Sequence, residues 1–154
     1  MNLSKIVLIA SLVCFSSVLA FAQTKTKPPV NVPVAANQAK SSPAYAEVLL
    51  RKTELLAELE SLLVEYTEDY PNVKQLRYQT GLLKKEFDKM AAFNPSESAK
   101  LSVALGKLIV RKCELDTDLW SLQQEFNDQQ PDVKRARRKS EIFDAAIKEI
   151  LQGK

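Results

Sequence analysis

An internal repeat at an offset of sixty residues constrains this 154-residue chain more than any other feature. When residues 51–74 are placed over residues 111–134 without a gap, eleven of the twenty-four positions are identical. Chance similarity between two helices would not hold a proline and several charged residues in register, so the repeat predicts duplication of one supersecondary unit. In the first copy the identical positions are Arg51, Lys52, Glu54, Leu55, Leu59, Ser61, Leu62, Glu65, Pro71, Val73 and Lys74.

Each copy predicts two helices, because its apolar residues recur in steps of three and four on both sides of the shared proline. One position of each apolar seam holds a lysine instead, Lys52 in the first copy and Lys112 in the second. Ser42-Pro43 and Asn94-Pro95 have the hydroxyl or amide cap followed by proline that is typical of a helix start. The predicted helices span residues 44–68, 71–91, 95–128 and 131–151.

The predicted fold is all-α, with two tandem helical hairpins that form an up-down-up-down four-helix bundle. Leu49, Leu56 and Leu63 widen the apolar stripe of the first helix, and a helix of this kind needs two neighbours. A proline inside a helix costs about 3 kcal/mol, whereas a proline in the first turn costs little. Pro71 and Pro131 therefore favour tight turns. The alternative is a long, kinked, antiparallel coiled-coil hairpin, because the apolar spacing continues through both prolines.

The amino-terminal part of the sequence predicts export. A basic start is followed by an apolar run, residues 6–20, and by Ala20-Phe21-Ala22, which matches a signal-peptidase site. We expect residues 1–22 to be a cleaved signal peptide, which would leave no integral membrane span. Residues 23–43 are rich in proline and predict a flexible linker. The duplicated domain is expected at 44–151, with its copies at 44–91 and 95–151, in a periplasmic or secreted protein.

The composition argues against catalysis and nucleic-acid binding. Histidine is absent, and 22 basic residues nearly balance 19 acidic ones. We predict that the chain is not an enzyme and uses neither a cofactor nor a metal ion. After signal cleavage Cys113 would be the one remaining cysteine, either a small buried hydrophobe or the site of an intermolecular disulfide.

Two features are candidates for a partner surface. Trp120 stands where the first copy has Glu60, and it is either a second-layer core residue or an aromatic anchor for a partner or for self-association. The other feature is a basic cluster at the start of the last helix, which could also make weak contact with an anionic surface. The basic cluster consists of Lys134, Arg135, Arg137, Arg138 and Lys139.

The basic cluster has a competing explanation inside the predicted bundle. Cations near a helix amino terminus oppose the helix dipole, so compensating acidic residues are expected nearby. In an up-down-up-down bundle the end of the first helix would lie beside the start of the fourth. We therefore expect Arg135 and Arg138 to face the acidic residues at that end. These are Glu60, Glu65, Glu68 and Asp69.

The segment from Tyr66 to Lys74 resembles the periplasmic helical segments of polysaccharide co-polymerases, the chain-length-determinant proteins. There too an aromatic residue, a short polar stretch, proline and valine interrupt a coiled coil, and residues 126–134 repeat the pattern. The likeness does not extend to the transmembrane helices or the kinase-like domain of that family, so it does not imply polysaccharide export. The whole chain is also similar to a group of small exported bacterial helical-repeat proteins, a likeness that implies no activity.

These observations predict a non-catalytic interaction or structural module of the cell envelope, with a protein partner or self-association. The alternative is a periplasmic holdase-type chaperone. A chaperone of that kind exposes an apolar cradle between helices, whereas the apolar positions here are expected to be used by the protein's own bundle.

Overall fold

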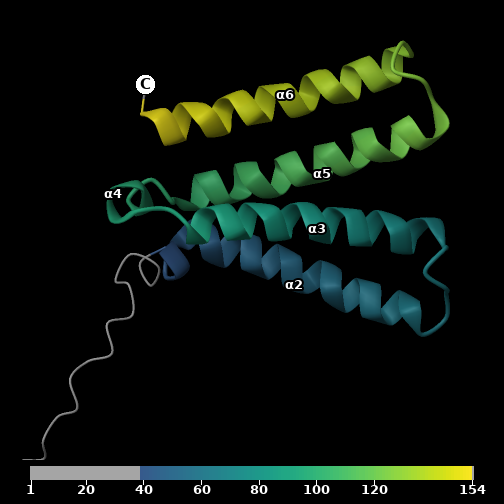
Figure 1. The fold of residues 1–154 in the computed structure, drawn as a ribbon, viewed down its shortest axis with the longest axis horizontal. Coiled ribbons are helices and arrows are strands. Elements are labelled where there is room, and N and C mark those ends of the chain that lie inside the picture. The colour runs from purple at the N-terminus through teal and green to yellow at the C-terminus, as the bar shows by residue number, and fades with distance from the viewer. Residues whose placement is uncertain (1–38, 154) are drawn as a thin grey trace, which may run out of the picture. The chain divides into compact units, whose positions relative to one another are not determined.

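A computed structural model describes residues 39–153 of the chain. This range is all-helical, and the expected signal peptide and most of the expected linker lie outside it. The four long helices run up, down, up and down, as predicted (Figure 1). The helices are α2 (Pro43–Leu63), α3 (Pro71–Ala91), the short α4 (Pro95–Ser98), α5 (Val103–Glu125) and α6 (Pro131–Gln152).

Both hairpins turn immediately before a proline. Pro71 and Pro131 occupy the first turns of α3 and α6, where the missing N–H has no helical partner to lose. Within the turns, Tyr70 N–H donates to the Thr67 carbonyl over 3.0 Å, and Gln130 N–H donates to the Asn127 carbonyl over 3.1 Å. The chain leaves the helix between Leu63 and Pro71, so the alternative of a continuous kinked helix is wrong.

Helix α5 begins later than the sequence predicted. We expected one helix from residue 95, but the chain forms the one-turn helix α4 and then leaves helical geometry before Val103. Asn94 and Glu97 close a capping box around α4, and the Ser102 side chain caps α5 by accepting from Leu105 N–H over 3.2 Å. Between these caps Leu101 is buried and its carbonyl accepts from Ala44 N–H. A straight helix could not provide both the second cap and this contact.

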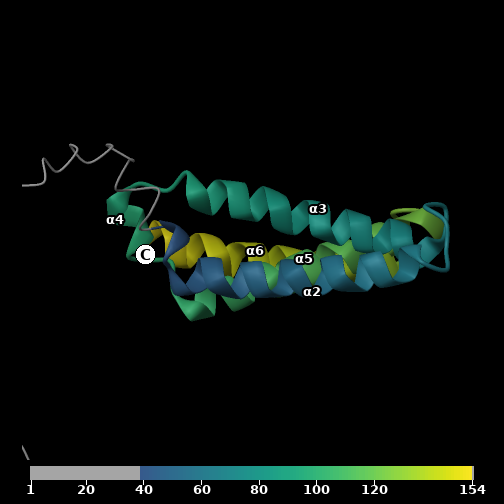
Figure 2. The same ribbon diagram turned by 90° about the horizontal axis from the view of Figure 1, so that it is seen from below.

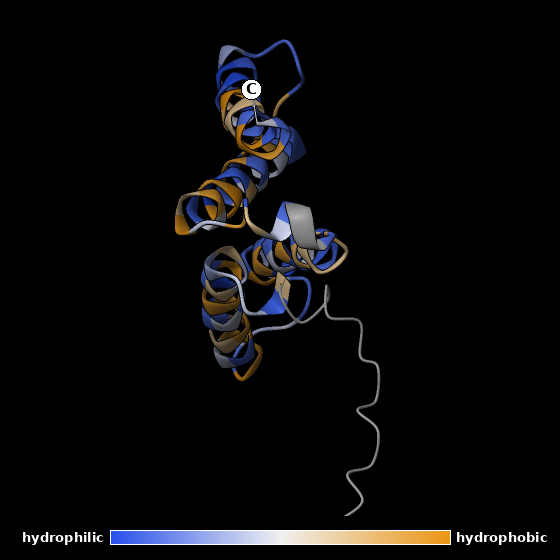
Figure 3. Ribbon diagram, turned by 90° about the vertical axis from the view of Figure 1, so that its left-hand side faces the viewer, coloured by the Kyte–Doolittle hydropathy of each residue, from blue (hydrophilic) through white to orange (hydrophobic). Residues whose placement is uncertain are grey.

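Helix α5 is the centre of the packing. It lies against α2, α3 and α6, whereas α6 has its extended contact with α5 alone. Figures 1 and 2 show the α2–α3 turn and the α5–α6 turn at the same end of the bundle. The prediction that the first and last helices are close neighbours is therefore wrong. The long helices carry both polar and apolar positions (Figure 3).

The core follows the predicted seams. It is continuous across the two hairpins and is closed near α4 by Leu101 and Met90. Its largest fully buried hydrophobic side chains are Leu55, Leu83, Met90, Leu101, Leu105, Val48, Val73 and Val133. The seam position at Leu119 is only partly buried, whereas the equivalent Leu59 is 3% exposed, so the two copies do not contribute equally.

Candidate functional site

An apolar groove lies between α3, α5 and α6, near the end that carries α4. It has a volume of about 420 Å³. The groove exists because α6 packs on α5 without packing along α3, which leaves space above the α5 surface. Its apolar lining comes from Met90, Phe93, Leu105, Ile109, Ile147 and Leu151.

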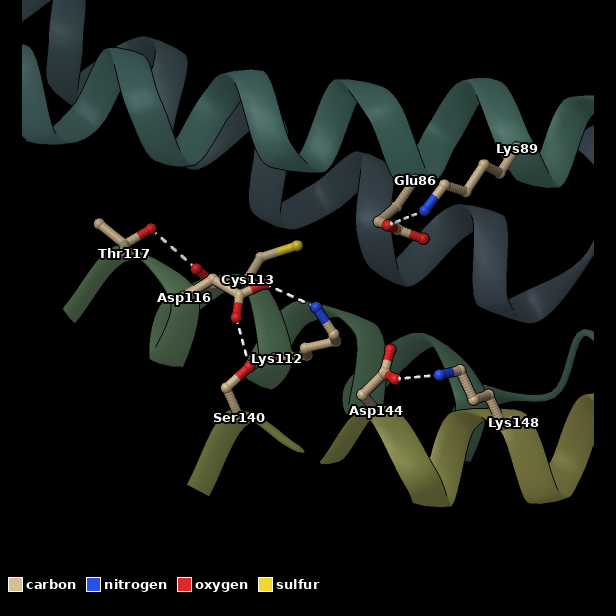
Figure 4. A network of polar contacts seen from close by, with 9 residues as sticks. All are labelled: Glu86, Lys89, Lys112, Cys113, Asp116, Thr117, Ser140, Asp144 and Lys148. Atoms are coloured by element: carbon tan, nitrogen blue, oxygen red, sulfur yellow. Dashed lines mark hydrogen bonds and ion pairs between the residues drawn. The ribbon is translucent and has the colours of Figure 1, made fainter. Parts of the chain in front are cut away.

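Charged side chains of alternating sign form the rim of the groove. They come from all three helices (Figure 4). Lys89 donates to Glu86 over 2.6 Å, and the Lys148 ammonium lies 2.6 Å from an Asp144 carboxylate oxygen. The hydrogen bond from Lys148 lowers the pKa of Asp144, so this carboxyl group is ionised. The rim can therefore meet both positive and negative groups on a ligand.

Lys112 is a rim residue whose pKa is affected both by burial and by a nearby carboxylate. Burial alone would lower its pKa, but the hydrogen bond and the charge of Asp116 raise the pKa overall. Its ammonium lies 2.6 Å from Asp116, which also accepts from the hydroxyl of Ser140 on α6 (Figure 4). This small network ties α6 to α5 beside the groove. A lysine in an otherwise apolar seam was the sequence signal for this site, although we did not assign it a role.

Cys113 lies next to this network, but its thiol is unreactive. Its thiol is buried, and burial raises its pKa to about 12, so it stays protonated at neutral pH. A protonated, inaccessible thiol is neither a nucleophile nor a ready disulfide partner. Of the two roles considered from the sequence, the folded state has the buried small hydrophobe.

The basic cluster lies on the first turns of α6, and its arginines are paired within their own hairpin. Arg137 Nη2 is 2.7 Å from Asp128, Arg138 Nη1 is 3.2 Å from Glu141, and Arg135 pairs with Asp132. Among the described residues no ion pair joins the cluster to the end of α2 or to the turn that follows it, where Glu68 binds Arg77 instead. The predicted pairing between the first and last helices is therefore wrong, because α2 and α6 share no extended contact.

Trp120 is half-buried at the contact between the two hairpins. Its ring stacks on Tyr78 of α3, with 4.7 Å between the ring centroids and 13° between the planes. Trp120 therefore contributes to the fold of the single chain. No hydrogen bond or ring contact joins it to the basic cluster within the described residues, so the two candidate features do not form one site.

Other kinds of site are not apparent in the part of the chain that the structure covers. Among residues 39–153, no three Cys, Asp or Glu side chains gather closely enough to hold a metal ion. Within the same range, no helix combines the length and the apolar character needed to cross a bilayer. The chain matches no protein-family model, and neither a curated protein nor a solved structure is significantly similar to it.

Proposed function

We propose that this chain is a non-catalytic interaction module exported to the bacterial cell envelope, where the groove between α3, α5 and α6 binds an amphipathic helix of a partner protein. The observation that carries the proposal is an apolar groove that the chain's own helices leave open. Three helices already provide its walls and floor, which is the geometry in which a further helix can bury an apolar face.

The charge on the rim favours a protein helix over an anionic lipid. Lys89, Lys112 and Lys148 are each paired with a carboxylate, so the rim has little net positive charge. A headgroup with one sign of charge would displace these carboxylates, whereas a helix with both lysine and glutamate at its flanks can exchange partners with them. Burial of its apolar face would then supply most of the binding free energy.

Photo-crosslinking in the native envelope tests this proposal. A photoreactive residue replaces Lys89 on the groove rim or, as a control, Lys84, which is exposed on a different face of the same helix. We expect a discrete protein adduct from position 89 and none from position 84. The variant Ala92→Trp should fill the groove and abolish the adduct, whereas Ala145→Trp on the exposed side of α6 should leave it intact. Equal adducts from both positions, or an adduct that survives Ala92→Trp, would exclude the groove as the binding site.

A holdase-type chaperone is the second candidate. The sequence suggested that the bundle uses all its apolar positions, but Leu49, Leu50 and Leu56 of α2 and Ile142 of α6 are exposed. Exposed apolar side chains of this kind, together with an open groove elsewhere on the domain, are a surface that an unfolded client could bind. Suppression of the aggregation of a chemically denatured, unrelated protein at equimolar ratio would favour this function. A partner-specific module should leave that aggregation unchanged.

A further inference from the structure

The outer face of α2 is apolar and uncovered. Leu49, Leu50 and Leu56 are 42%, 58% and 37% exposed, and Leu49, Leu56 and Leu63 follow one another at intervals of seven residues. Ala46 and Ala57 lie on the same face and are also exposed. A leucine stripe with this spacing is typical of a helix that packs against another helix. Within residues 39–153, no element covers Leu49, Leu50 or Leu56, whereas Leu63 at the end of the stripe packs partly buried against the core.

The same positions sixty residues later are covered. Gly106, Ile109, Cys113 and Thr117 of α5 correspond to Ala46, Leu49, Thr53 and Ala57 of α2, and all four are buried. The first hairpin covers them. Ala44 and Glu47 of α2 lie directly over Gly106, and Tyr78 of α3 lies over Trp120. The face of α5 that is equivalent to the outer face of α2 therefore packs against a helical hairpin of this same sequence type.

We propose that the chain assembles head to tail with further copies of itself, with the outer face of α2 of one molecule docked on α5 and α6 of the next. The contact would repeat, between molecules, the packing of the first hairpin on α5. In each such contact, the residue of the first hairpin would be replaced by the residue sixty positions later in one molecule. The residue of α5 would be replaced by the residue sixty positions earlier in the other molecule.

Charge complementarity supports this occupant. The stacked pair Tyr78 and Trp120 would be replaced by Arg138 of one molecule and Glu60 of the other, which have opposite charges and are both exposed. The ion pair between Arg51 and Glu114, 3.3 Å long inside the chain, would be replaced by Arg111 and Glu54. Two opposite-charge pairs at equivalent positions would fix the register of the two molecules.

Apolar surface and net charge fit the same arrangement. Leu82 of α3 packs partly buried against the core, and its equivalent Ile142 is 56% exposed and would be available to cover the leucines of α2. The basic cluster would face α2, which carries four glutamates, Glu47, Glu54, Glu58 and Glu60. At one point the contact between molecules would be looser than the equivalent contact inside the chain, because Ala46 has a methyl group where Gly106 has none. Since the two surfaces differ, the contact would be heterologous, and the rotation between neighbouring molecules would decide between a closed ring and an open filament.

Charge reversal in the full exported chain tests the arrangement, with sedimentation velocity over a concentration series at low salt. Glu60→Arg alone and Arg138→Glu alone should each weaken self-association, by roughly tenfold in Kd, because like charges then meet. A mixture of the two variants should associate as the unchanged protein does, since every contact between unlike molecules again pairs an acid with a base. Lys85→Glu, a charge reversal on the exposed side of α3, should have no effect.

Three results would overturn the proposal. The first is a monomer at every concentration. The second is a mixture of Glu60→Arg and Arg138→Glu that associates no better than either variant alone. The third is loss of association in Leu56→Glu with no change in Arg138→Glu, which would indicate a symmetric contact between two α2 helices. Circular dichroism must show that each variant is folded. Ala92→Trp, which fills the groove, should leave self-association unchanged, so failure of this proposal and failure of groove binding are distinguishable.

Discussion

Gly106 of α5 lies so close to Ala44 of α2 that a Cβ atom built on the glycine would be 2.9 Å from the Ala44 Cα atom and 2.8 Å from the Glu47 Cβ atom. Real Cβ atoms do not approach backbone this closely, so the two helices must move apart if the glycine is replaced. The close approach also brings Ala44 N–H to the Leu101 carbonyl, at 3.2 Å. Gly106 therefore sets the distance between the two hairpins.

We expect Gly106→Ala to lower the free energy of unfolding by about 1–2 kcal/mol, since overpacking outweighs the gain in helix propensity. Gly81→Ala is the matched control, because nothing lies within 4 Å of a Cβ atom at that helical position. That variant should raise stability by about 0.5–1 kcal/mol. Urea unfolding of the two variants measures both effects. A stabilising Gly106→Ala would show that the helices do not meet there.

Leu59 and Leu119 occupy equivalent seam positions but differ in burial. Leu59 is 3% exposed, whereas Leu119 is only partly buried. We expect Leu59→Ala to cost about 2–5 kcal/mol and Leu119→Ala distinctly less, because less apolar surface is lost there. Thermal unfolding followed by circular dichroism gives the comparison. Equal losses would contradict the unequal packing of the two hairpins.

Trp120→Glu introduces the residue that the first copy has at this position. It removes the stack on Tyr78 and brings a charge to a half-buried site, so stability should fall by about 1–3 kcal/mol. Tyr78→Phe keeps an aromatic ring and should cost much less. Urea titration read by circular dichroism is suitable, because the first variant has no tryptophan fluorescence. Unchanged stability in Trp120→Glu would mean that the stack does not join the hairpins.

Stability should fall in alkaline solution partly because of Cys113. Burial raises the pKa of the folded thiol to about 12 from an ordinary value of 9.0, so the folded state favours the protonated form. This contribution is complete below pH 9 and is lost between pH 9 and 12, with a slope of up to about 1.4 kcal/mol per pH unit. The pH dependence of urea unfolding should therefore be shallower in Cys113→Ala than in the unchanged protein. Identical slopes would contradict the burial of the thiol.

Export should leave Gln23 as the first residue, because Ala20-Phe21-Ala22 fits a signal-peptidase site. Intact-mass measurement on protein from the native envelope checks this. A mass that includes residues 1–22 would contradict cleavage and would favour a membrane anchor. Substitution of Ala22 by a large residue should block processing, which provides the control.

The sequence was sufficient to predict the helices but not how they pack. The two hairpins follow from Pro71 and Pro131 and from the apolar spacing on either side of each proline. These signals could be read from the sequence because they depend only on residues close together along the chain. The contacts between hairpins depend on single positions at which the copies differ, such as Gly106 against Ala46 and Trp120 against Glu60. These differences are visible in the sequence, but their meaning depends on which helix lies opposite. The groove could not be predicted for the same reason, because it is the space that remains where α6 does not pack along α3.

The attachment of α6 through one neighbour has a mechanical consequence. Helices α2, α3 and α5 brace one another in pairs, whereas α6 rests on α5 and is tied to it beside the groove by Ser140 and Asp116. The α5–α6 packing is extensive, and Lys100 also donates to the Leu151 carbonyl near the end of α6, so this one side of the helix carries nearly all of its attachment. A substitution that weakens the α5–α6 contact would therefore displace the whole of α6, whereas the mutual contacts of α2, α3 and α5 would remain.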